Sequence, residues 1–142
     1  MPNALYGRAK QKFLNPGTLG STSSSSIDLI DDTIRVALVD LGTYTFNADH
    51  EFFSSVSSAV VGTPVDLTSK TVDTSGVFDA ADPTFTGVSG ASVEALVIYK
   101  WTGSNATSSL IAFIDTATSG LPVTPNGGDI TVQFSASGIF AL

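Results

Sequence analysis

The chain has 142 residues, enough for one domain with an arm or linker but not for a second catalytic domain. Hydrophobic residues make up 42% of it. The chain contains no cysteine, which excludes disulfides, thiolate metal sites and cysteine nucleophiles. His50 is the only histidine, so a Ser-His-Asp triad could be built only around that residue. The formal net charge of −7 argues against a body that binds nucleic acid or an anionic membrane.

The chain divides into an arm, a tether and a body. Residues 1–14 contain three basic residues and no acidic one, a side-chain sum of +3, whereas residues 15–142 sum to −10. A run rich in glycine, serine and threonine, residues 17–26, has the composition of a flexible tether. We therefore expect a basic arm over 1–16 and an acidic body over 27–142.

The arm has the pattern of a short amphipathic helix over residues 3–14. Asn3 can cap its first turn, and Leu5, Ala9 and Phe13 recur every four residues. A helix of roughly three turns is marginal by itself. It must dock on its own body, on a neighbouring subunit or on another protein.

A protein partner is favoured over nucleic acid for this arm. Three positive charges give only weak, salt-sensitive binding to nucleic acid, whereas apolar side chains can anchor a helix in a protein groove. The residues predicted to bind the partner are Leu5, Tyr6, Arg8, Lys12 and Phe13.

From Ile27 onward the pattern is that of β-strands separated by turns. Apolar residues alternate over 33–40 and 93–101, and because both faces are apolar, these two segments are predicted to be central strands. Further strands are expected at 109–115 and 129–135, and weaker ones at 56–61, 65–72, 84–88 and 138–142. Many short strands predict a mainly β fold, an antiparallel β-sandwich or a jelly-roll-like barrel.

Two kinds of segment interrupt these strands. Asp49 is positioned to cap a short helix over 49–56, the one helical segment expected in the body. Turn signals occur at Gly62-Thr-Pro, in the glycine- and proline-rich stretch 119–128 and at the other strand boundaries. Gly120, Gly127 and Gly128 are interpreted as turn glycines, because no helix or lysine follows them as in a phosphate-binding loop.

Few residues offer chemistry, and each has a simpler structural interpretation. His50 is followed by Ser54, Ser55 and Ser57, but no Gly-x-Ser-x-Gly elbow accompanies it, which favours a surface histidine. Two acidic clusters lack the EF-hand pattern and are interpreted as turn residues rather than calcium ligands: Asp28, Asp31 and Asp32, and Asp79 and Asp82. Neither a metal nor a cofactor is expected.

The segment Tyr99-Lys100-Trp101 combines aromatic and basic side chains at the end of a predicted strand. Such residues can stack on bases or sugars, but one lysine in an acidic body favours packing in the core or at an interface. The sequence shows neither a membrane span nor a signal peptide, so we expect synthesis in the cytoplasm. The Asn105-Ala106-Thr107 sequon is then a chance match.

Four segments resemble a family of small virion structural proteins of tailed bacteriophages: 3–14, 27–40, 92–101 and 110–134. The segments 92–101 and 110–134 are the most distinctive, and none of the four contains a catalytic motif. The chain departs from the family pattern in its longer serine-rich stretch, Gly20–Ser26, and in missing polar residues that the pattern has between Phe134 and Ile139.

The resemblance implies a non-enzymatic structural protein of the virion, made in the host cytoplasm. It favours a capsid decoration or cement protein that binds the major capsid protein and neighbouring copies of itself as a homo-oligomer, without nucleic acid or membrane partners. A tail or head–tail connector protein is the alternative. A small binding module or hydrolase built around His50 is a more distant third.

Overall fold

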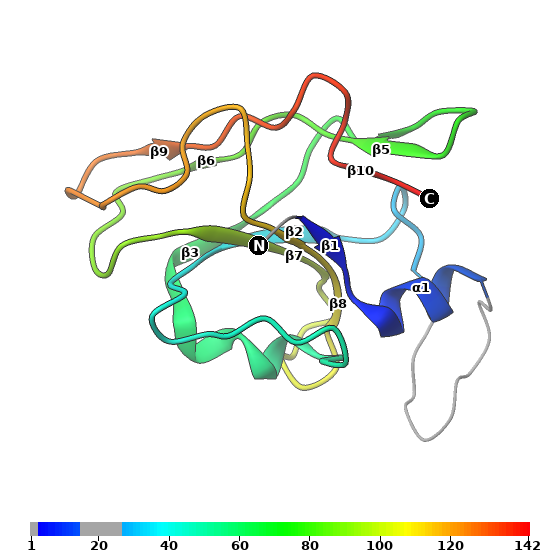
Figure 1. Cartoon of the computed structure of the whole chain (residues 1–142), viewed down its shortest axis with the longest axis horizontal. Coiled ribbons are helices and arrows are strands. Elements are labelled where there is room, and N and C mark those ends of the chain that lie inside the picture. Colours follow the sequence, from blue (N-terminus) through cyan, green and yellow to red (C-terminus); the bar gives the residue numbers. More distant parts are fainter. Residues whose placement is uncertain (1–2, 15–26) are drawn as a thin grey trace.

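The computed structural model describes residues 3–14 and 27–142 and shows a mainly β protein built from antiparallel sheets (Figure 1). Its largest sheet has five strands, in the spatial order β1 (Ala4–Leu5), β8 (Ser109–Ile114), β7 (Ala95–Lys100), β2 (Ile34–Val39) and β3 (Val60–Asp66). The sequence-predicted central strands are confirmed as β2 and β7, because each is hydrogen-bonded to a neighbour on both sides.

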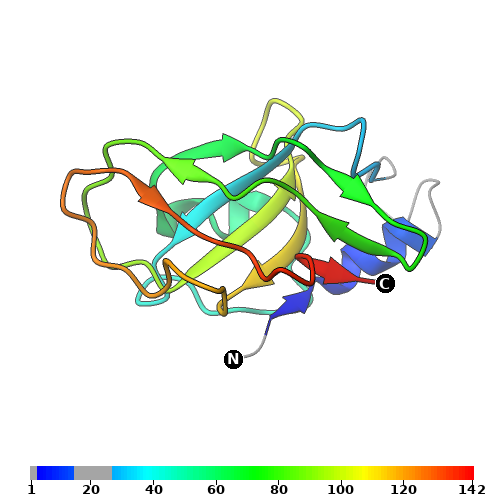
Figure 2. The same ribbon diagram turned by 90° about the horizontal axis from the view of Figure 1, so that it is seen from above.

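A second layer of short strands lies over one face of this sheet (Figures 1 and 2). It holds a three-stranded sheet, β10 (Phe140–Ala141), β5 (Val77–Asp79) and β4 (Thr71–Val72), and a two-stranded sheet, β6 (Thr84–Phe85) with β9 (Ile130–Thr131). The two layers give the sandwich-like arrangement that the strand pattern predicts.

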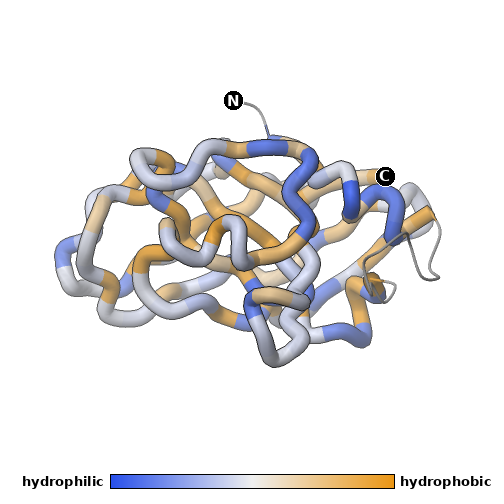
Figure 3. Tube along the Cα trace, turned by 90° about the horizontal axis from the view of Figure 1, so that it is seen from below, coloured by the Kyte–Doolittle hydropathy of each residue, from blue (hydrophilic) through white to orange (hydrophobic). Residues whose placement is uncertain are grey.

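The core lies against both faces of the five-stranded sheet. Every residue of β8 is buried, as are all residues of β7 except Lys100. Figure 3 shows apolar segments of the chain alternating with more polar ones. The face away from the second layer is covered by residues 40–59 (Figure 1). There the Phe53 ring stacks on the Tyr99 ring, with centroids 3.8 Å apart.

Residues 49–56 do not form the predicted helix. Two 3-10 turns stand there instead, η1 (Phe53–Ser55) and η2 (Ser57–Ala59), and the residue before the first turn is Phe52, which makes no side-chain cap. Asp49 caps neither turn. Phe53 is buried in the core, and its backbone N–H bonds to Ser108 O at 2.8 Å. Because this N–H is bonded to a distant carbonyl, it cannot take part in a continuous helix over 49–56.

The predicted turn at Gly62-Thr-Pro lies inside strand β3. Val65 pairs with Val36 and Val61 with Leu38, so three residues of β3 stand opposite one residue of β2. The excess residues form a β-bulge, for which Gly62 adopts a φ of +74°. The turn-forming residues are therefore read correctly as irregular backbone, but their placement between strands is wrong.

The remaining strand predictions hold in part. The segment predicted at 129–135 forms a strand only at Ile130–Thr131, with an isolated bridge from Gln133 to Ser119. Of the weaker segments, 65–72, 84–88 and 138–142 contain the two-residue strands β4, β6 and β10, whereas 56–61 is mostly 3-10 turn and joins β3 only at its last two residues. Positive φ values at Gly120 and Gly127 confirm these two as turn glycines. No helix in the described part of the chain has the length and apolar character needed to cross a membrane.

Candidate functional site at the N-terminal arm

The N-terminal arm lies on its own body, the first of its three possible docking sites. Ala4 and Leu5 extend the five-stranded sheet as β1, opposite Phe113 and Ala112 of β8. The single α-helix of the described residues follows, α1 (Gly7–Leu14), which is shorter than the predicted helix over 3–14. Figure 2 shows α1 at one end of the sandwich, near β10.

Asn3 does not cap the helix, contrary to the sequence prediction. Its Oδ1 accepts hydrogen bonds from the backbone N–H groups of Asp115 (2.8 Å) and Thr116 (2.9 Å), and its Nδ2 donates to Thr116 O at 2.9 Å. The side chain thus joins the start of β1 to the end of β8. A local capping pattern could not reveal this role, because the partners lie more than a hundred residues away.

Tyr6 is the fully buried anchor between β1 and α1. Its backbone N–H bonds to Ile111 O at 3.0 Å, and its hydroxyl lies 3.0 Å from the Tyr44 hydroxyl. The Tyr44 hydroxyl in turn lies 2.9 Å from His50 Nδ1. Burial, together with the contact to Tyr44, raises the pKa of Tyr6 far above its usual range, so this phenol stays neutral.

Lys12 reaches from the helix into the body and has only 1% of its surface exposed. Its Nζ donates to Ser109 Oγ at 2.8 Å, lies 3.1 Å from Glu51 Oε2 and sits 5.1 Å from the centre of the Phe52 ring. Removal from water lowers the pKa of Lys12, and the Glu51 carboxylate opposes that shift. The arm is therefore held by a buried cation as well as by apolar contacts.

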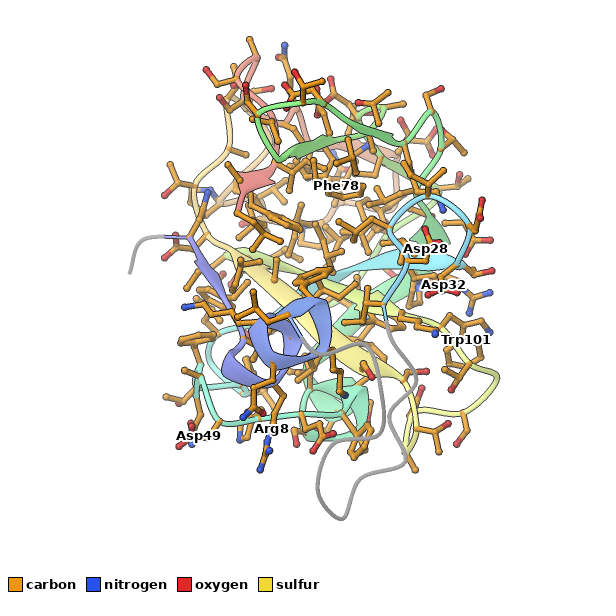
Figure 4. All side chains as sticks on the ribbon, turned by 90° about the vertical axis from the view of Figure 1, so that its right-hand side faces the viewer. Arg8, Asp28, Asp32, Asp49, Phe78 and Trp101 are labelled. Atoms are coloured by element: carbon orange, nitrogen blue, oxygen red, sulfur yellow. The ribbon has the colours of Figure 1, made fainter. Side chains whose placement is uncertain are left out.

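The five residues predicted to bind a partner fall into three groups by their exposure. Tyr6 and Lys12 point into the body, where their contacts are with the same chain. Leu5 and Phe13 are half-buried, and the Phe13 ring lies 6.3 Å from that of Phe140. Arg8 is exposed and points outward on the side of Asp49 (Figure 4), with its Nε 3.9 Å from Glu51 Oε1.

A groove of about 570 Å³ runs between the arm and the C-terminal strand β10. Leu5, Ile114 and Phe140 contribute apolar surface to it, and Lys10 stands in its lining. Among the basic side chains of the described residues, Lys10 alone makes no hydrogen bond or ion pair within that part of the chain. Lys10 is not among the residues predicted to bind a partner, because nothing local in the sequence distinguishes it from the other basic residues of the arm.

Two strongly exposed apolar residues belong to the segments that border this groove. Leu14, the last residue of α1, is 86% exposed, and Leu142, which lines the groove directly, is 64% exposed. Exposed leucines beside a groove lined by both polar and apolar groups make this end of the molecule a candidate surface for binding another protein. We refer to Lys10, Leu14, Phe140 and Leu142 together as the arm face.

The other candidate residues are engaged in structural contacts. His50 faces a tyrosine, and the Ser57 hydroxyl donates to Ser54 O at 3.3 Å. Asp28 Oδ1 accepts the N–H groups of Ile30 and Asp31, and these bonds, that of Asp31 first, lower the pKa of Asp28. The described residues contain no group of three or more histidine, aspartate or glutamate side chains placed to hold a metal ion.

The Tyr99-Lys100-Trp101 segment packs as its structural interpretation predicts. Tyr99 is buried under Phe53, and Lys100 Nζ lies 3.0 Å from Asp32 Oδ2. The Arg35 guanidinium lies 4.4 Å from the centre of the Trp101 ring and is held by Asp66 at 2.6 Å. These contacts fix the end of the central strands.

Neither a known protein family nor a curated protein matches this chain at a significant level.

Proposed function

We propose that this chain is a non-enzymatic structural protein of a tailed-phage particle, most specifically a capsid decoration or cement protein. In this role it binds the outer shell of the major capsid protein and stands beside neighbouring copies of itself. It needs no cofactor for that role. The resemblance of four of its segments to small virion structural proteins is the starting point of the proposal.

The arm face is the observation that carries the proposal. Most polar groups of the arm are paired within the chain, while Lys10, Leu14 and Leu142 point to solvent at one end of the sandwich. Exposed leucines beside a lysine that forms no ion pair among the described residues suit a protein surface that offers apolar side chains and a carboxylate. The acidic remainder of the body discourages contact with nucleic acid.

Binding to purified empty shells tests this proposal. Deleting residues 1–20 is the simplest change, and loss of shell binding is expected, whereas a truncated body that saturates shells with unchanged affinity would exclude a role for the arm. The deletion also removes the buried Tyr6 and Lys12, so loss of binding must be separated from loss of folding.

A surface variant makes this separation. Lys10→Glu combined with Leu14→Asp leaves the buried contacts intact, and we expect it to weaken shell binding at least tenfold (~1.4 kcal/mol). Ala106→Asp is the control, because Ala106 is also exposed and apolar but lies in the loop between β7 and β8 and does not line the groove. Equal binding by both variants would contradict the proposal.

The copy number of the protein in a purified particle distinguishes decoration from the alternative function. A number comparable with that of the major capsid protein is expected for decoration. A single ring of subunits, together with rings or tubes formed by the purified protein alone, would instead indicate a tail or head–tail connector protein.

A further inference from the structure

We propose that the arm is exchanged between copies of this chain, so that β1 and α1 of one copy dock on the body of another. The body has a defined receptor site for the arm. Its backbone acceptors Ile111 O and Ala48 O take the N–H groups of Tyr6 (3.0 Å) and Gly7 (2.8 Å). A body without an arm would lose these two hydrogen bonds.

Buried side chains of the body also depend on the arm. Ser109 is 3% exposed and receives Lys12 Nζ, and Glu51 Oε2 is buried with that same ammonium 3.1 Å away. Undocking the arm breaks the contacts of Lys12 with Ser109 and Glu51, so a docked arm stabilises the body. The arm itself can come from the same chain or from a second one.

The contacts do not depend on which copy supplies the arm. Every contact of the arm described above joins residues 3–14 to residues beyond 27, and only residues 15–26 connect the two parts covalently. Twelve residues can span at most ~40 Å, which is about the diameter of a domain of this size. An arm can therefore reach the body of an adjacent copy and make the same contacts there.

Charge favours contact between an arm and a body over other contacts between copies. The arm sums to +3 and the remainder of the chain to −10, so two bodies repel each other while an arm attracts any body. A second copy is also the partner that carries the matching shape, since Tyr6 lies 5.1 Å from the Phe46 ring and Lys12 fills the site at Ser109. Exchange should appear at the millimolar local concentrations at which intermolecular docking competes with the tethered arm.

Arm exchange rests on the proposed function in one respect only, because it is the particle that would bring many copies close together. It can be tested on the free full-length chain, which contains no cysteine. Leu5 and Ala112 stand directly opposite each other on β1 and β8, as a pair next to the hydrogen-bonded pair Tyr6 and Ile111. Side chains at such a position lie close enough for a disulfide.

Leu5→Cys and Ala112→Cys proteins, purified separately, are mixed at high concentration, incubated and oxidised. Exchange predicts a disulfide dimer containing one chain of each kind, in several-fold excess over a control mixture of Leu5→Cys with Ala106→Cys. Ala106 is exposed and lies in the loop between β7 and β8. The yield should rise with protein concentration.

The double variant carrying both cysteines in one chain keeps the test decisive. If it closes its disulfide within the chain while the mixed single variants give no dimer above the control, the arm does not exchange and the inference is overturned. The closed double variant also separates the two proposals. If the double variant with its disulfide closed binds shells as wild type does, decoration does not require exchange. If the wild-type protein fails to bind shells, the proposed function is wrong whether or not the arm exchanges.

Discussion

Lys12 on the helix and Ser109 on β8 are joined by a 2.8 Å hydrogen bond, although 97 positions separate them in the sequence. Both residues are buried, and the Glu51 carboxylate lies 3.1 Å from the same ammonium. The contact fixes the helix on the sheet at one point. It also makes the arm sensitive to any change that leaves one of these charges without the other.

Glu51→Ala is expected to lower the free energy of unfolding by about 3 kcal/mol, because it leaves the Lys12 ammonium buried without its counter-charge. Lys12→Met keeps the length of the side chain and removes the charge, so in the Glu51→Ala background it should recover a large part of that loss. Urea denaturation of the two single variants and the double variant measures the coupling. Additive effects would show that the two charges do not interact.

Tyr6→Phe is expected to reduce the loss of stability at alkaline pH. The pKa of Tyr6 is raised in the folded state, so its contribution is complete below pH ~10, the ordinary tyrosine value, and is lost as the pH rises above it. The difference in urea midpoint between wild type and Tyr6→Phe, followed from pH 8 to 11, should therefore shrink or change sign. At neutral pH the variant should lose about 1 kcal/mol with its hydrogen bond to Tyr44.

Tyr99→Phe provides a comparison for that pH dependence. Burial raises the pKa of Tyr99 from its ordinary value of 10.0 to about 12 in the folded protein. Tyr99 therefore also loses its contribution to stability at alkaline pH, but only between these two pKa values. Lys12 acts in the opposite direction, since its lowered pKa adds stability as the pH rises toward 10.5. It is present in all three proteins, and its effect cancels in the differences. A Tyr6→Phe profile parallel to that of wild type would contradict the assignment.

Gly120→Ala is expected to destabilise the protein strongly. Gly120 has a φ of +96°, and a Cβ atom there would lie 2.5 Å from Thr131 O, so the backbone at β9 would have to move. Gly103 is the matched control, because its φ is +98° but nothing lies within 4 Å of the added atom. Thermal denaturation should show a loss of about 1 kcal/mol for Gly103→Ala and at least twice that for Gly120→Ala. Equal losses would mean that only the backbone conformation matters.

The sequence predicts the centre of this fold better than its periphery. Strands β2, β7 and β8 carry long apolar patterns, and their burial on both faces follows from those patterns. The two-residue strands β4, β6, β9 and β10 have no such pattern, because their pairing is decided by partners far along the chain.

The arm shows the same division. Its helical segment and its need to dock are predictable from its periodicity, as is the apolar role of Tyr6. The burial of Lys12 is not predictable, because a lysine on a short basic helix is ordinarily solvated and its partners Glu51 and Ser109 are distant in sequence. The prediction that Asn3 caps the helix is wrong for the same reason, because its side chain bonds to the backbone just after β8 instead.

The bulge in β3 has a consequence for how copies of this protein can associate. β3 forms one edge of the five-stranded sheet, and an unbroken edge strand invites pairing with the next molecule and then with another, as in fibrils. Gly62 interrupts the regular pairing pattern there, and Pro64 has no N–H to offer a further strand. The opposite edge is only the two residues of β1. Neither edge of the sheet therefore favours endless extension from molecule to molecule, and any association of copies has to use contacts other than the pairing of further strands at these two edges.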